Sequence, residues 1–202
     1  MQENVLIDVI DDLKAVLDRL GHDYSLIRHP AGGLKRVGSV DLPVSYRLFL
    51  EHFAPNGAEI RFAQYHALTF YLQDELELVQ SKNYSQDGFL VIGLYDEQPL
   101  LLKLSDSEEG DAGVFKASGR QYLRMAGSFF QFLRMFQLSL EMLGSLSDFD
   151  EAVPGYQEEE EMGYHDSYED VGAMRSREEL LEEFYNELEM IDPDGAENWG
   201  LD

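Results

Sequence analysis

Cysteine is absent from the 202 residues of this chain. Its absence excludes disulfide bonds, thiolate metal sites and cysteine nucleophiles, and it fits a reducing compartment. Long apolar runs are also missing, since no segment approaches the roughly 20 apolar residues that a membrane helix needs. The first residues, MQENVLIDVIDDLKAVLDRL, lack the basic start and the unbroken apolar stretch of a signal peptide. The sequence therefore predicts a cytoplasmic protein with no membrane partner.

Basic residues are scarce, because 15 Lys and Arg face 40 Asp and Glu for a formal net charge of -25. Residues 1–144 carry 20 acidic and 13 basic residues, a net of -7, whereas residues 145–202 carry 20 acidic and 2 basic residues, a net of -18. Such a chain repels nucleic acid and attracts a basic protein. Basic residues also form no run with aromatic residues that could track a nucleic acid. We expect a basic protein partner and no nucleic acid, with a purely solubilising surface as the alternative.

Motifs of common catalytic and cofactor sites are missing as well. The five histidines show no metal-ligand spacing, and the chain has no GxSxG, GxGxxG or GxxxxGK[ST] motif. The acidic stretches SDSEEG and DPDG both lack the carboxylate pattern of a calcium loop. We therefore expect no metal, no cofactor and no catalytic residue. An enzyme is kept as an alternative, because a polar cleft with shifted titratable groups leaves no motif in a sequence.

Apolar residues are plentiful, at 44% of the chain with 12 Phe and 11 Tyr, so a sizeable core is available. Apolar residues at helical spacing predict helices near residues 5–20, 43–53 and 129–143. Ser128 and Gln131 predict a capping box at the start of the third helix. The segment 21–40, with its glycines and a proline, is expected to be irregular. Short β-rich runs between the second and third helices predict about five or six strands. Because these strands do not alternate with helices, the sequence predicts an α+β fold with a mainly antiparallel sheet flanked by helices.

The character of the chain changes at Ser145. Residues 145–175 are acidic, poor in apolar residues and interrupted by Gly and Pro, which predicts a partly disordered linker. Ser176 and Glu179 then form a capping box that opens an amphipathic helix. We expect an α+β domain at 1–144, a linker at 145–175, and a helix with a C-terminal tail at 176–202. This helix packs on its own domain or, alternatively, docks into a groove of a partner.

The stretch LPVSYRLFLEHFAPNGAEI predicts a short helix that leads directly into the first strand. Pro43 suits a first helical turn. Tyr46, Phe49 and Phe53 fall on one helical face, which indicates burial rather than ligand contact. Asn56 and Gly57 can take a left-handed turn that ends the helix.

Three motifs in this order resemble the SUKH superfamily, which includes the yeast cell-wall-synthesis regulators of Smi/Knr type. They are a helix entry with Leu-Pro, Tyr, Phe-Leu and Asn-Gly, a central strand ending in Ile-Gly, and a closing helix with Ser-Phe-x-x-Phe-Leu. The residues concerned, all expected to belong to the fold and not to a binding site, are Leu42, Pro43, Tyr46, Phe49, Leu50, Asn56, Gly57, Ile92, Gly93, Ser128, Phe129, Phe132 and Leu133. The match covers about residues 40–140. It departs from the family pattern where Ala58 replaces a common second glycine and where DEQP replaces a glycine-rich turn.

The resemblance implies an interaction protein. Many bacterial members resemble immunity proteins that bind and neutralise a toxin, often a nuclease. A nuclease needs a basic groove for phosphates, and an acidic surface would dock there with steered association. We therefore expect acidic side chains to bind a basic toxin domain, and the candidates are Asp106, Glu108, Glu109, Asp111, Glu158, Glu159, Glu160 and Glu161.

Two alternatives to this assignment remain open. The two acidic stretches can be ordinary solvated loops, as charge runs usually are. The chain can also be a regulatory or scaffold domain of Smi/Knr type that acts through protein–protein contacts without any toxin.

Overall fold

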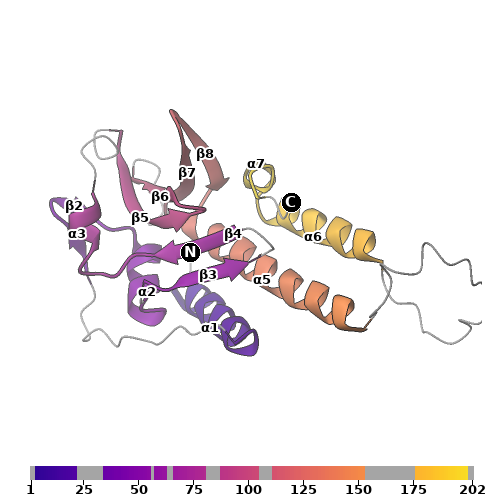
Figure 1. Ribbon diagram of the computed structural model, residues 1–202. Coiled ribbons are helices and arrows are strands. Elements are labelled where there is room, and N and C mark those ends of the chain that lie inside the picture. The colour runs from indigo at the N-terminus through magenta and orange to yellow at the C-terminus, as the bar shows by residue number, and fades with distance from the viewer. Residues whose placement is uncertain are drawn as a thin grey trace, which may run out of the picture.

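The structure of the chain is a computed structural model, which describes residues 3–21, 34–55, 57–62, 66–80, 87–104, 111–152 and 176–199. The strands of the main sheet (Figure 1) are β3 (Glu59–Phe62), β4 (His66–Phe70), β5 (Phe89–Tyr95), β6 (Gln98–Lys103), β7 (Gly113–Ser118) and β8 (Gln121–Ala126). Each strand pairs antiparallel with the next along the chain, so the sheet order is β3-β4-β5-β6-β7-β8. The predicted α+β class with a mainly antiparallel sheet is confirmed.

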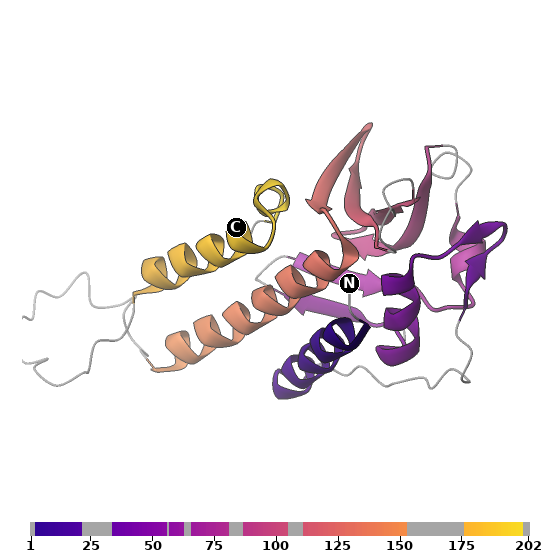
Figure 2. The ribbon, with the colours of Figure 1, turned by 180° about the vertical axis from the view of Figure 1, so that it is seen from behind.

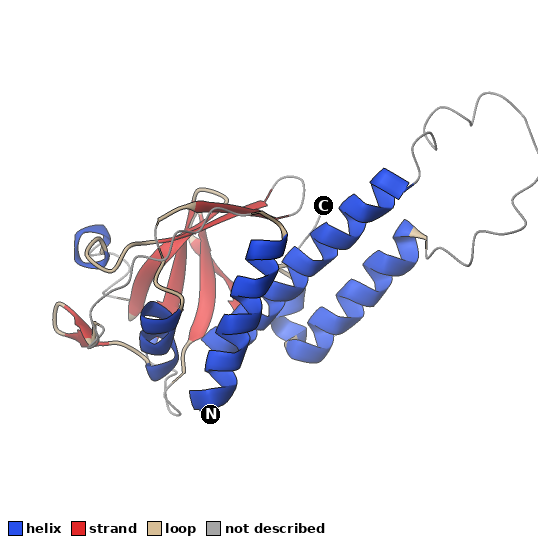
Figure 3. Ribbon diagram, turned by 90° about the horizontal axis from the view of Figure 1, so that it is seen from below, coloured by secondary structure: helices blue, strands red, loops and turns tan. Residues whose placement is uncertain are grey.

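The helices of the described residues are α1 (Glu3–Arg19), α2 (Val44–His52), α3 (Leu76–Val79), α5 (Phe129–Ala152), α6 (Arg177–Ile191) and α7 (Pro193–Ala196). α5 lies between α1 and α6 and packs against both (Figures 1 and 2). Seen from below, the long helices lie together beside the strands (Figure 3). One continuous apolar core joins this helical layer to the sheet.

The helix α2 delivers the aromatic residues of the entry motif to this core. Tyr46 and Phe49 are fully buried. The ring centroid of Phe49 lies 4.7 Å from that of Phe70 in β4 and 5.2 Å from that of Phe129 in α5. Aromatic pairs at such distances add to the stabilisation that burial provides. α2 therefore links the sheet to α5, as expected for residues of the core.

Positive backbone φ angles mark the break between α2 and the sheet. Ala54 has a φ of 50° and Gly57 a φ of 74°, and glycine adopts this conformation without the cost of a Cβ atom. The break predicted at Gly57 is therefore confirmed, whereas Asn56 lies outside the described residues. At the other end of α2, Pro43 is the N-cap residue rather than a member of the first turn.

Gly93 allows a close approach between two strands. A Cβ atom at this position would lie 2.1 Å from the carbonyl oxygen of Thr69 in β4, which is too close for any side chain. The pairing of β5 with β6 also shifts register between Val91 and Gly93, as at a β-bulge. The Ile-Gly pair of the central strand therefore has a physical explanation, since Ile92 is buried in the core and Gly93 admits the neighbouring backbone.

The start of α5 differs from the prediction in one hydrogen bond. Ser128 Oγ accepts from Gln131 N at 3.1 Å, as a helix cap does. Gln131 Nε2, however, donates to the carbonyl oxygen of Ile191 at the end of α6, at 2.8 Å. The predicted capping box is therefore wrong in its second half. The reason is that α6 ends beside the start of α5 and offers a carbonyl that has no partner within its own helix.

Two further features differ from the prediction, namely a hairpin and the end of α5. Part of the segment predicted to be irregular forms a hairpin of β1 (Arg36–Val37) and β2 (Val40–Asp41), with an ion pair of 2.7 Å between Arg36 and Asp41. In addition, α5 continues to Ala152, beyond the predicted domain boundary at residue 144. Residues 145–152 contain neither Gly nor Pro, so their acidic composition does not stop the helix.

The hydroxyl of Tyr46 is buried and has no hydrogen-bond partner among the described residues, and burial raises the pKa of this phenol far above its ordinary value. We expect Tyr46→Phe to keep or increase the free energy of unfolding, by up to about 1 kcal/mol, because an unpaired buried polar group is removed. Tyr46→Ala, which empties the site, should lower it by about 3–5 kcal/mol. Urea unfolding followed by the fluorescence of Trp199, the single tryptophan, measures both. A clear loss of stability in Tyr46→Phe would contradict the prediction.

Candidate interaction surface

Only one of the acidic residues predicted to contact a partner, Asp111, belongs to the described residues. The others, Asp106, Glu108, Glu109, Glu158, Glu159, Glu160 and Glu161, lie outside them. Asp111 Oδ1 accepts hydrogen bonds from Ser45 Oγ at 2.6 Å and from Phe129 N at 3.0 Å, and Oδ2 accepts from Phe130 N at 3.3 Å. A carboxylate is favoured at the first N–H groups of a helix. Asp111 therefore ties α5 to α2, and this internal use weighs against a role as partner contact.

The helix α6 has one buried apolar stripe and one open face. It starts with the predicted capping box, in which Ser176 Oγ accepts from Glu179 N at 3.2 Å and Glu179 Oε2 accepts from Ser176 N at 2.8 Å. Phe184 and Leu188 are buried in the main core. Of the two alternatives for this helix, the structure shows packing on its own domain, and the opposite face is left to solvent.

Trp199 fixes the C-terminal segment to the core. Its side chain is fully buried, and Nε1 donates a hydrogen bond to Ser139 Oγ in α5. Ser139 Oγ donates in turn to the carbonyl oxygen of Met135 at 2.9 Å. The indole also meets the ring of Phe132 edge to face at 5.1 Å. Trp199 was not predicted to belong to the core, because its polar partner lies on a helix that is distant in the sequence.

Arg124 in β8 holds the turn that joins α6 to α7. Its Nη1 lies 2.8 Å from Asp194 Oδ2, and its Nη2 lies 3.3 Å from Asp192 Oδ2. The carboxylate of Asp192 is buried and also accepts from Gly127 N and from Gly195 N. The acidic DPDG stretch is therefore a helix cap and an ion-pair site, whose charge Arg124 offsets.

The same segment covers part of the free edge of β8. Asn198 Nδ2 donates to the carbonyl oxygen of Arg124 at 3.0 Å. A Cβ atom on Gly195 would lie 2.5 Å from the carbonyl oxygen of Met125, so only glycine lets α7 approach the strand so closely. Unpaired edge strands are open to unwanted association. α7 covers this part of the sheet edge. Because α7 also contacts α6, it helps to hold α6 in place.

The solvent face of α6 is acidic, and we call it the α6 acidic face. Its carboxylates are Glu178, Glu179, Glu182, Glu183, Glu187 and Glu189. Within the described part of the chain, Glu178, Glu182 and Glu189 form no ion pair. Glu178 and Glu182 are neighbours at i,i+4, and like charges at this spacing destabilise a helix by about 0.2–0.5 kcal/mol. Packing on α5 therefore maintains a face whose charges repel one another.

Met190 adds an apolar group to this face. It is 78% exposed and follows Asn186 and Glu187 by one helical turn. Protein interfaces are enriched in methionine and usually surround an apolar centre with a polar rim. The α6 acidic face thus combines an exposed apolar side chain with polar groups around it, as protein interfaces do.

The other flank of α5 is acidic too. In α1 the exposed carboxylates are Asp8, Asp11, Asp12 and Asp18, and Lys14 contacts one of them, Asp11, at 3.1 Å. α1 and α6 lie on either side of α5 (Figure 2). Acidic groups therefore border the helical layer on both flanks.

Comparisons of the chain with protein-family models, curated proteins and solved structures find no match. The SUKH resemblance therefore stays a prediction that rests on its motifs. Among the described residues, no helix is long and apolar enough to cross a bilayer. In the same part of the chain, no three His, Asp or Glu side chains are placed to hold a metal ion. The fold and the surface together define an α+β domain that presents acidic helices on both flanks of α5.

Asp192 should matter more for stability than its exposed neighbour Asp194. Asp192→Ala removes the cap of α7 and leaves Gly127 N and part of Arg124 without an acceptor, so we expect the free energy of unfolding to fall by about 1–3 kcal/mol. Asp194→Ala, which removes the same charge from a side chain that is 74% exposed, should cost less than about 1 kcal/mol. Urea unfolding of both variants tests this, and equal losses would contradict the central position given to Asp192.

Proposed function

We propose that the chain is a protein-binding domain that captures a basic protein on the α6 acidic face. The observation that carries the proposal is the rigid presentation of Glu178, Glu182 and Glu189, which form no ion pair with any described residue. Phe184, Leu188 and Trp199 hold the helix against the core, so association orders little additional backbone. A basic partner would relieve the repulsion between neighbouring glutamates, and the net charge of -25 would speed the encounter.

We further propose that the partner is a toxin domain, with a nuclease as the leading example, and that the chain acts as its immunity protein. A nuclease surface that holds phosphates is basic, and an acidic helix seated on it would exclude the substrate. The support for this step is the SUKH resemblance, whose described aromatic residues lie in the core. The proposed protein acts by occupancy and performs no catalytic step. It acts in the cytoplasm, in agreement with a chain that contains no cysteine.

The alternative function is a regulatory or scaffold domain of Smi/Knr type. One form of that alternative uses the C-terminal helix as a free docking element for a partner groove. The burial of Phe184 and Leu188 weighs against this form, because the apolar stripe of α6 is already used inside the domain. A regulatory domain would then bind through the same acidic face, and the identity of the partner separates the two functions.

The charge reversal Glu178→Lys with Glu182→Lys tests the proposed surface. The control is Asp8→Lys with Asp12→Lys, which makes the same change of net charge at the same i,i+4 spacing on α1. We expect the α6 variant to bind a basic partner about tenfold more weakly or worse, because charges at an interface set the attraction and its salt dependence. The control should bind nearly as tightly as the unmodified chain.

The measurement uses the full chain and its two variants as baits in extracts of the cells that make it, at low and high salt, with mass spectrometry of the retained proteins. Support requires a basic protein that the α6 variant loses, that salt weakens, and whose toxicity co-expression of the chain suppresses. Equal retention by both variants would refute the acidic face as the binding surface. A retained regulator without toxicity would refute the immunity role and favour the regulatory one.

A further inference from the structure

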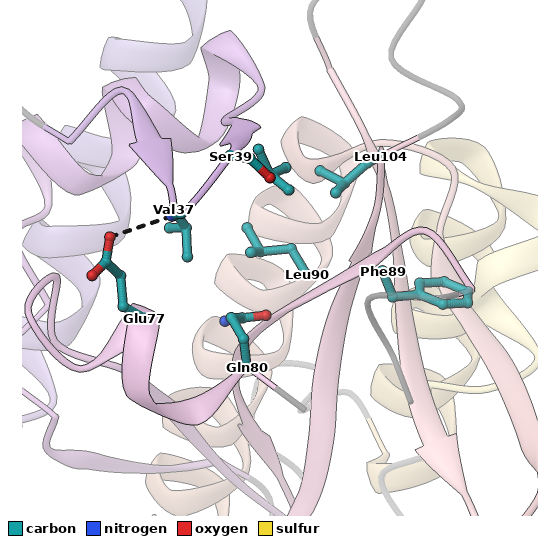
Figure 4. Close-up of a pocket in the computed structure, with 9 residues that line it drawn as sticks. Val37, Ser39, Glu77, Gln80, Phe89, Leu90 and Leu104 are labelled. Carbon is teal, nitrogen blue, oxygen red and sulfur yellow. Dashed lines mark hydrogen bonds between the residues drawn. The ribbon is translucent and has the colours of Figure 1, made fainter. Parts of the chain in front are cut away.

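A pocket of about 390 Å³ lies between the β1-β2 hairpin, the end of α3 and the start of β5. Figure 4 shows the side chains of Val37, Leu90 and Leu104 around it, with the ring of Phe89 pointing away. Val37 and Leu90 belong to the main core, whereas Phe89 belongs to a smaller apolar cluster on the sheet. The volume falls within the range of about 300–1,000 Å³ that ligand pockets have. One side of this pocket is therefore apolar.

Gln80 forms a wall that is fixed by hydrogen bonds. Its Nε2 donates to the carbonyl oxygens of Leu76 at 2.7 Å and Val91 at 2.9 Å, and its Oε1 accepts from Val91 N at 2.9 Å. These bonds join the end of α3 to β5. The wall is therefore preformed, and the amide of Gln80 has little capacity left for a ligand.

The polar groups still available in the lining are those of Glu77 and Ser39. Gly38 N donates to Glu77 Oε1 at 3.3 Å, which ties the hairpin to α3, while Glu77 Oε2 has no partner among the described residues. Among the described residues that line the pocket, none is Lys, Arg or His. An anion would therefore meet repulsion here, whereas an aliphatic chain that ends in a cation would find both an apolar wall and a carboxylate.

We propose that this pocket binds a lysine or arginine side chain presented by a protein partner. The aliphatic stem would lie against Val37, Leu90 and Leu104, and the cationic end would remain near water beside Glu77, as long basic side chains prefer. Leu78, the next residue in α3, is 84% exposed and offers an apolar contact for the rest of the partner segment. The net charge of -25 favours the approach of a basic segment from solution.

This contact goes beyond the acidic-face proposal because it lies elsewhere on the molecule. The hairpin and α3 are at one end of the structure and α6 is at the other (Figure 1). The two proposals therefore depend on different residues, and each has its own test.

The test is an NMR titration of the full chain, labelled with nitrogen-15, at low ionic strength. The probes are Nα-acetyl-lysine amide and Nα-acetyl-norleucine amide, which has nearly the same stem and no charge. We expect the lysine probe to shift the amide signals of Gly38, Ser39 and Leu104 in a saturable way, and the norleucine probe to bind more weakly. Glu77→Gln, which keeps an acceptor for Gly38 N, should weaken lysine binding roughly two- to fivefold, as expected for an exposed ion pair. The control Asp74→Asn removes a nearby charge outside the pocket and should leave binding unchanged.

Three results would overturn the proposal: no saturable shift at these amides, equal binding of both probes, or equal effects of Glu77→Gln and Asp74→Asn. None of them bears on the α6 acidic face, because the titration needs no protein partner. Conversely, saturable lysine binding that depends on Glu77 would support the pocket even if charge reversal on α6 left every protein complex intact.

Discussion

The buried face of α5 is the constraint on which the other elements depend. Three of its rings, Phe129, Phe132 and Phe136, are fully buried. Phe136 meets Phe62 of β3 at 5.2 Å, and Phe132 meets Trp199 at 5.1 Å. Complete burial of one such side chain contributes about 1.5–3 kcal/mol. The sheet and the C-terminal segment both pack aromatic side chains against this helix. The position of α6 therefore depends on how α5 packs.

The chain sorts its carboxylates into two groups. Asp111 and Asp192 sit near the start of α5 and accept hydrogen bonds from the backbone N–H groups of Phe129 and Gly127. They are removed from solvent in part or in full, and such positions require donors around the charge. On the α6 acidic face, by contrast, Glu178, Glu182 and Glu189 are exposed to solvent. The acidic side chains therefore have two roles. A few of them stabilise the fold through hydrogen bonds, and others lie exposed on the surface.

Features set by neighbours in sequence were predictable, and features set by distant neighbours were not. The aromatic spacing of α2 predicted its buried face, and the Ser176–Glu179 pair predicted its own capping box, because both depend on residues within one or two helical turns. Gln131 was expected to make the same local bond to its helix cap, but its side-chain amide donates to the carbonyl oxygen of Ile191 in α6 instead. Asp111 looked like part of a solvated loop because its donors on α2 and α5 are far away in the chain.

The candidate sites were also predictable only where they depend on residues that are close in the sequence. The acidic composition of α6 was visible, but its importance as a rigid face depends on Trp199 and Ser139, which meet only in the folded chain. The pocket required even more distant information, because its walls come from the hairpin, the end of α3, the start of β5 and Leu104 just after β6. A sequence pattern with period 2 or 3.6 indicates which face of an element is buried. It does not indicate where three elements fail to fill the space between them.

The two proposed contacts would respond differently to salt, and this difference follows from their construction. The α6 acidic face acts through several hydrated charges, whose influence decays over about 10 Å at 0.1 M ionic strength. The pocket combines one carboxylate with apolar walls, and burial of an aliphatic stem does not depend on screening. A basic partner would thus be drawn in mainly by the helix at low salt. Any preference for one particular lysine or arginine of that partner would come from the pocket, because shape and burial there distinguish a side chain that fits from one that is merely positive.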